Sequence, residues 1–216
     1  LGAIHRGHVA VELAERGTSF EAVAMLLWSG RLEPTRFYAE GLGLPVRAVS
    51  GLLRDRAPLA LLSVVVPLLA VRDPGRFSAS DEAELARARG LIVRLAACLG
   101  LGRPATLPRA LAAESVAKTL AVALGSKSRE AERALDLALV LCADHELNPS
   151  TFAARVTASS GADLYACLAS AIATLSGPKH GGTCDRIEAM LAEIASPAHA
   201  GRVVEERTRR GEELQG

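Results

Sequence analysis

Aromatic side chains are scarce in this sequence of 216 residues, where they make up only 3%. Hydrophobic residues nevertheless account for 50%, so the core has to be built mainly from leucine, alanine and valine. No excess of charge of either sign is present, because 25 lysines and arginines face 24 aspartates and glutamates. No basic block recurs that could follow the phosphates of a duplex, so we do not expect nucleic acid as a partner.

Cysteine pairs and long apolar runs are also lacking. The four cysteines form no CxxC motif, which favours free thiols in a reducing cytoplasm: Cys98, Cys142, Cys167 and Cys184. The most apolar segment, 58–71, is shorter than the roughly 20 residues that a membrane span needs. No signal peptide is recognisable, and because the chain opens with Leu1 we expect a trimmed N-terminus. We therefore expect a cytoplasmic protein without a membrane anchor.

Helical periodicity and helix-capping residues recur along the whole chain, and no alternating strand or internal repeat is evident. The sequence therefore predicts an all-α fold. The expected helices are a short one ahead of Gly17 and then segments of roughly 18–30, 32–42, 46–56, 58–71, 80–99, 108–124, 128–143, 150–159, 162–175, 183–194 and 199–210.

One histidine stands at the tip of a tight turn. The segment 176–182 reads Ser-Gly-Pro-Lys-His-Gly-Gly, and a predicted helix begins directly after it. A neutral imidazole of His180 could donate a hydrogen bond to a carbonyl or enolate oxygen without acting as an acid. Taken alone, such a histidine could equally fill or cap the turn.

A second histidine follows the predicted helix 128–143. The segment 143–151 reads Ala-Asp-His-Glu-Leu-Asn-Pro-Ser-Thr, so either neighbouring carboxylate could orient His145, and an imidazolium there would suit an anionic substrate. Asn148 and Ser150 add short polar groups that could bind a substrate or orient a histidine. Capping of the next helix by Ser150 or Thr151 is an equally good local explanation.

These segments together resemble the citrate synthase family. The resemblance rests on 143–151, on Ala-Ser-Ser-Gly-Ala at 158–162 and on Gly-Pro-Lys-His-Gly-Gly at 177–182, in that order and spacing. The early Arg-Gly at 6–7 and the helix 19–30 are also similar to that family, so the likeness covers most of the chain.

The resemblance implies a multi-helical homodimer that condenses acetyl-CoA with oxaloacetate to citrate and CoA, an acyltransferase reaction without a tightly bound cofactor or a metal. It implies that His180 hydrogen-bonds the enol oxygen and that Ser150 orients His180. His145 helps to bind oxaloacetate, with Asn148 beside it as a further substrate-binding residue. Residues 1–182 would form the large helical domain, and 183–216 the start of the small domain.

Two departures from the family accompany this likeness. After residue 182 the chain has Thr183 and Cys184 where the family usually has Ala-Asn. It also ends ahead of the family's Gly-His segment with the second catalytic histidine and ahead of the catalytic aspartate. We therefore expect the 216 residues by themselves to lack synthase activity.

Three alternatives remain from the sequence. The chain could be a non-catalytic, citrate synthase-like module for ligand binding or oligomerisation, or belong to a 2-methylcitrate synthase that uses propionyl-CoA. A metal site is the third alternative, although the spacing lacks the close ligand pairs of usual metal sites: Asp144, His145, His180 and Cys184.

Overall fold

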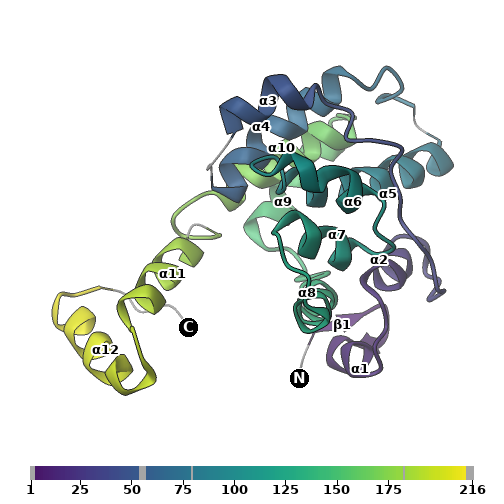
Figure 1. Ribbon diagram of the computed structural model, residues 1–216. Coiled ribbons are helices and arrows are strands. Elements are labelled where there is room, and N and C mark those ends of the chain that lie inside the picture. Colours follow the sequence, from purple (N-terminus) through teal and green to yellow (C-terminus); the bar gives the residue numbers. More distant parts are fainter. Residues whose placement is uncertain (1–2, 54–56, 79, 182, 213–216) are drawn as a thin grey trace.

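The computed structural model describes residues 3–53, 57–78, 80–181 and 183–212, and the regular secondary structure of this part is almost entirely helical (Figure 1). The predicted all-α fold is confirmed. The helices are α1 Ala10–Glu15, α2 Phe20–Ser29, α3 Val46–Leu53, α4 Pro58–Val71, α5 Asp81–Cys98, α6 Leu107–Leu111, α7 Val116–Ala123, α8 Arg129–Leu141, α9 Pro149–Ser159, α10 Leu164–Leu175, α11 Thr183–Glu193 and α12 Ala200–Arg209, with short 3₁₀ turns at Pro104–Thr106 and Pro197–His199.

A small hairpin precedes α1 and was not predicted. Its strands, β1 Ile4–His5 and β2 His8–Val9, are antiparallel. The turn between them has φ of 45° at Arg6 and 87° at Gly7, and two positive φ values match the twist of a tight hairpin. Strands of two residues are too short for an alternating pattern, which is why periodicity does not reveal them.

Two buried polar side chains connect this N-terminal part to the later helices. The His5 side chain is fully buried, and its Nε2 donates to the Val140 carbonyl of α8 at 3.1 Å. Glu21 of α2 is 1% exposed, and its Oε1 accepts the Val116 N–H of α7 at 2.6 Å. A carboxylate at the first N–H of a helix stabilises the positive end of the helix dipole. These contacts tie β1 to α8 and α2 to α7.

The helix predicted over 32–42 is wrong, because the structure has no helix between α2 and α3. Pro34 disfavours helical geometry at the residue before it, and Phe37 is buried in an aromatic stack on Trp28 with 5.6 Å between ring centroids.

Arginine side chains from neighbouring helices bind the carbonyls of this segment. The Nε of Arg94 donates to Gly41 at 3.0 Å, and the Nε of Arg72 donates to Gly43 at 2.8 Å.

The single helix predicted over 108–124 is also wrong, since the structure has α6 and α7 with a break between them. Ser115 starts α7, and its Oγ accepts the Lys118 N–H at 3.1 Å. The buried Thr119 hydroxyl bonds to the Ala110 carbonyl at 3.1 Å, which ties the two short helices together. Serine competes with the helical backbone for hydrogen bonds, and here its cap is stronger than the continuous helical pattern.

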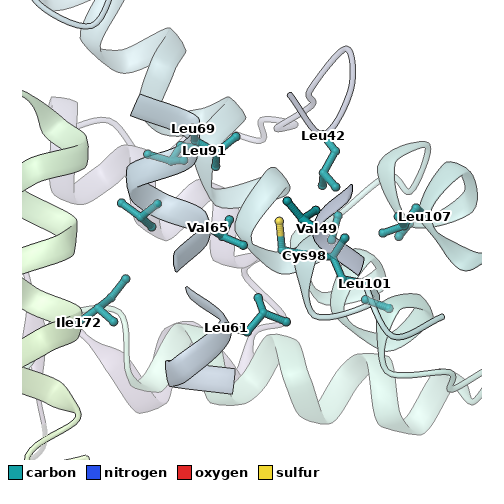
Figure 2. Packing of buried hydrophobic residues seen from close by; sticks show 14 of the residues in the cluster. Leu42, Val49, Leu61, Val65, Leu69, Leu91, Cys98, Leu101, Leu107 and Ile172 are labelled. Atoms are coloured by element: carbon teal, nitrogen blue, oxygen red, sulfur yellow. The ribbon is translucent and has the colours of Figure 1, made fainter. Parts of the chain in front are cut away.

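The largest core cluster lies where α4, α5 and α10 meet (Figure 2). Leu61, Val65 and Leu69 recur every four residues and form the buried face of α4. They belong to one cluster with Leu91 of α5 and Ile172 of α10. As predicted, the core consists mainly of aliphatic side chains. None of the helices in the described ranges is long and apolar enough to cross a membrane.

A buried tyrosine fixes the start of α10 to the turn after α4. The Tyr165 hydroxyl donates to Asp73 Oδ2 at 2.8 Å, and the Arg87 Nε donates to the same oxygen at 2.9 Å. Burial by itself raises the pKa of the Asp73 carboxyl. Hydrogen bonds from Tyr165, Arg87 and the Gly75 N–H outweigh that effect, so the pKa is lowered overall. Burial and the same bond to Asp73 raise the pKa of Tyr165 to about 12.

This carboxylate predicts a specific loss of stability in acid. Because its pKa is lowered in the folded protein, Asp73 stabilises the fold above the unfolded value of 3.8, and this contribution disappears as the pH falls through the lowered pKa. Urea unfolding at a series of pH values is expected to give a smaller acid loss for Asp73→Asn than for the parent, together with lower stability at neutral pH. The exposed Glu15→Gln is the control and should follow the parent. An unchanged acid slope in Asp73→Asn contradicts this assignment.

The last two helices stand apart from the others. In Figure 1, α11 and α12 project away from the group formed by α1 to α10. Arg207 of α12 joins them, because its guanidinium is 2.7 Å from Glu193 of α11 and 2.9 Å from Glu212. A guanidinium between two carboxylates resists rearrangement better than one exposed pair.

Candidate active site

Two helices of nearly equal length bring the candidate residues together. The helix α9 has 11 residues and α10 has 12, and they pack closely against each other. Gly161, with φ of 77°, allows the chain to reverse between them. In an antiparallel pair of this kind, the beginning of one helix lies beside the end of the other. Ser150 in the first turn of α9 therefore meets His180, which follows α10.

The side chains of these two residues are in direct contact. The distance between His180 Nε2 and Ser150 Oγ is 3.0 Å, and both residues are partly buried. The Ser150 hydroxyl donates to Asn148 Oδ1 at 2.8 Å, and the Thr151 N–H donates to the same oxygen at 2.9 Å. Asn148 is thus the N-cap of α9, and capping by Ser150 or Thr151 is wrong. The signal was present in the sequence, since Pro149 after an asparagine is typical of a helix start.

The direction of the Ser150 hydroxyl bond decides which nitrogen of a neutral His180 imidazole carries the proton. While the Ser150 hydroxyl donates to Asn148 Oδ1, its oxygen accepts from His180 Nε2–H, because a serine hydroxyl has a single proton. If the hydroxyl turns to donate to Nε2, the neutral imidazole carries its proton on Nδ1 instead. The orientation of one hydroxyl therefore selects the nitrogen through which His180 can donate to a substrate.

A tight turn holds the His180 backbone. Its N–H donates to the Gly177 carbonyl at 3.0 Å. A Cβ added to Gly181 would lie 2.6 Å from both the carbonyl oxygen and the side chain of Leu175. Only glycine allows the chain to pass so close to the end of α10, and this close approach fixes where the imidazole begins. The glycine at 182 lies outside the described residues.

His145 lies on the loop between α8 and α9 and is exposed. Asp144 Oδ1 accepts the Glu146 N–H at 3.0 Å, and Glu146 has a positive φ of 56°. The Asp144 carboxylate therefore stabilises the turn. The structure shows no hydrogen bond from the His145 side chain to a described residue, so the expected orientation by a neighbouring carboxylate is not observed. Ser150, Asn148 and His180 are brought together, and no hydrogen bond joins the His145 side chain to them.

The metal hypothesis has no support from the described residues. Among them, no three His, Cys, Asp or Glu side chains gather closely enough to hold a metal ion. The side chain of Cys184, a candidate ligand, lies outside the described part of the structure.

The serine contact leads to a spectroscopic prediction. Replacing Ser150 with alanine removes the partner of His180 Nε2, so the imidazole ¹⁵N resonances of His180 are expected to shift and its tautomer ratio to change. Stability should fall by only about 1 kcal/mol, the typical worth of one hydrogen bond. Ser159→Ala, which removes a hydroxyl at the other end of α9, is the matched control. Identical His180 spectra in the parent and Ser150→Ala would refute the contact.

Fold and geometry together define the class of this protein: an all-helical protein with an imidazole positioned by a serine next to a helix start. Residues 3–216 match the family described as citrate synthase, C-terminal domain. The chain therefore belongs to the citrate synthase family.

Individual relatives agree with this membership. The chain is 32% identical over 209 residues to a citrate synthase of Deinococcus radiodurans, covering 89% of this chain and 55% of the relative. It is 32% identical over 219 residues to a putative citrate synthase 2 of Mycobacterium tuberculosis, covering 98% of this chain and 57% of the relative. The chain thus spans about half the length of these curated relatives.

A solved structure shows the same arrangement of helices. It is the citrate synthase of Thermoplasma acidophilum in a ternary complex with carboxymethyl coenzyme A and oxaloacetate. It superposes with a TM-score of 0.76 at 26% identity, over 96% of this chain and 58% of that one.

Proposed function

We propose that this chain forms one side of the active site of a cytoplasmic acyltransferase that condenses acetyl-CoA with oxaloacetate to give citrate and CoA. The contact between Ser150 Oγ and His180 Nε2 at 3.0 Å carries the proposal. It joins two residues that the family resemblance selects and that lie thirty positions apart in the chain.

The proposed role of His180 follows from the chemistry of the acetyl group. The methyl protons of a thioester are weakly acidic, so negative charge develops on the thioester oxygen as a base removes one of them. A hydrogen bond from a positioned imidazole stabilises that oxygen in the transition state more than in the ground state. For His180 to donate to this oxygen through Nδ1–H, the Ser150 hydroxyl would turn from Asn148 Oδ1 to donate to His180 Nε2, and would then hold the ring in the donating tautomer.

Oxaloacetate would bind beside this histidine. The Asn148 oxygen is occupied by Ser150 and by the Thr151 N–H, so its amide NH₂ is the group that remains for a substrate oxygen. His145, exposed on the neighbouring loop, would contribute a hydrogen bond or a positive charge to the dicarboxylate.

We further propose that residues 1–182 belong to the large domain and that 183–216 begin the small domain. The separation of α11 and α12 from the other helices in Figure 1 supports this boundary. The base that deprotonates acetyl-CoA and a second histidine for the oxaloacetate carbonyl would come from residues outside this chain. Binding of the substrates between the two domains would then bring the residues of the complete active site together.

Thiol release tests the proposal. A protein translated from the whole reading frame should release CoA from acetyl-CoA and oxaloacetate, and a parallel assay with propionyl-CoA distinguishes a citrate synthase from a 2-methylcitrate synthase. Since His180 stabilises an oxyanion, His180→Ala is expected to lower kcat roughly 100- to 1000-fold with a small effect on oxaloacetate binding. The 216-residue chain alone should stay at background.

The control is the exposed His199→Ala, outside the candidate site, which should keep full activity. Intact mass separates the alternatives: a native protein of about 22.5 kDa without thiol release supports a non-catalytic module. Undiminished kcat in His180→Ala, or thiol release by the 216 residues alone, contradicts the proposed division of roles.

We also propose that the protein is a homodimer. Val64, Leu68 and Val71 are exposed on α4 at helical spacing, and Phe152 and Val156 are exposed on α9. Both helices pack on α10, so these apolar rows belong to neighbouring elements. A second copy is the simplest cover for them, because closed twofold contacts are the commonest form of self-association.

Sedimentation equilibrium checks this assignment. Carboxylates at the proposed interface would be desolvated without a partner, so the double variant Val64→Glu with Val156→Glu is expected to shift the dimer toward monomer. Leu137→Glu on α8, another exposed apolar position, is the matched control and should leave the dimer intact. A monomeric parent, or an unaffected double variant, would exclude these faces as the interface.

A further inference from the structure

A second concave site lies away from the segments 143–151 and 176–182. It is a pocket of about 390 Å³ between the end of α2, the segment after it and α5. Arg31, Thr35 and Arg89 are its polar donors, and Met25 and Leu85 form apolar walls. None of the residues that line it takes part in the proposed condensation.

Arg89 is the unusual member of this pocket. Its Nε is buried without a hydrogen-bond partner, and no hydrogen bond or ion pair joins its guanidinium to a described residue. The other arginines of α5 have described partners: Arg87 binds Asp73 and forms an ion pair with Glu84, although its buried Nη1 also lacks a hydrogen bond, and Arg94 binds the Gly41 carbonyl. An unpaired buried donor is costly and calls for a partner that the described chain does not supply.

The remaining lining residues favour an anionic partner. Arg31 is exposed and has no ion pair, and the partly buried Thr35 hydroxyl has no hydrogen bond within the described chain. Glu33 is the single carboxylate of the lining, and it forms no ion pair with either arginine. Ser29 also lines the pocket, but its hydroxyl donates to the Met25 carbonyl at 2.8 Å. Two guanidinium groups and a hydroxyl are thus available to one ligand.

We propose that this pocket binds the phosphate group of a small molecule, with Arg89, Arg31 and Thr35 as donors. Guanidinium groups match phosphate oxygens through paired N–H bonds, and a phosphate has more oxygens than a carboxylate to receive three separate donors. The Arg89 guanidinium gains the partner that it lacks among the described residues. This site is independent of the condensation chemistry proposed for His180.

The source of the phosphate is either the free ion or a larger phosphorylated molecule. A second pocket of about 540 Å³ adjoins the first and shares Ser29 and Leu85 with it. Trp28 forms part of its wall, and one face of its ring already stacks on Phe37. A ring attached to the phosphate would find an aromatic neighbour there. Tighter binding of AMP than of inorganic phosphate would identify the larger ligand.

Titration of the 216-residue chain with inorganic phosphate at constant ionic strength tests the site. Amide ¹H–¹⁵N resonances of Ser29 and Thr35 and the Arg89 Nε–H resonance should shift to saturation, and the melting temperature should rise with phosphate concentration. Arg89→Gln is expected to weaken binding about tenfold or more. Arg47→Gln removes an exposed arginine outside the pocket and should bind as the parent does.

A second variant distinguishes a loss of phosphate binding from a folding defect. Arg89→Met removes the buried unpaired guanidinium, so without phosphate its melting temperature should equal or exceed that of the parent, and phosphate should no longer raise it. AMP is titrated in parallel, and saturable binding of either probe at this pocket supports the site. Absence of saturable binding by both probes, or equal losses in Arg47→Gln and Arg89→Gln, would overturn the proposal.

Discussion

The packing of α9 against α10 is the contact on which the candidate site depends. Both helices are rich in alanine and serine, and small side chains let helix axes approach closely. The two helices differ in length by one residue, so the start of one and the end of the other meet. A hydrogen bond between Ser150 and His180 is a consequence of that geometry. Changes that shift α10 along α9 would separate these residues without altering either of them.

The same helix is anchored at its other end. Tyr165, at the start of α10, is buried and bonded to Asp73 after α4, and Arg87 of α5 holds the same carboxylate. Ile172 in the last turn of α10 belongs to the aliphatic core, and Leu168 and Ala169 pack against the same cluster (Figure 2). A helix fixed by a polar contact at one end and by the core along its length can hold the His180 turn in one position. Rigid support of this kind is what a hydrogen-bonding catalytic group requires.

Arginine side chains hydrogen-bond to backbone carbonyls that regular secondary structure does not satisfy. The segment between α2 and α3 has no helical hydrogen bonds, and Arg72 and Arg94 bind its carbonyls from outside. Arg87 joins α5 to the turn after α4 through Asp73, and it also pairs with Glu84 within α5. Against this background Arg89 differs from Arg87 and Arg94, because no hydrogen bond or ion pair joins its guanidinium to a described residue. The contrast within one helix separates structural arginines from one suited to a ligand.

Local rules were enough to predict most helices, including α5, α8 and α12, because periodicity and caps such as Ser80 and Ser128 are written in short stretches of sequence. The same rules failed at 32–42 and at 108–124, where long-range contacts of Phe37 and Thr119 outweigh local preference.

By itself, the sequence determined the all-α class, the family resemblance and the choice of His180, Ser150, His145 and Asn148 as candidates. Only the tertiary structure decided that Ser150 bonds to His180, that Asn148 caps α9, and that His145 stays exposed on its loop. The physical reason is distance: capping and periodicity act within a few residues, whereas the contact between residues 150 and 180 exists only after α9 and α10 have packed.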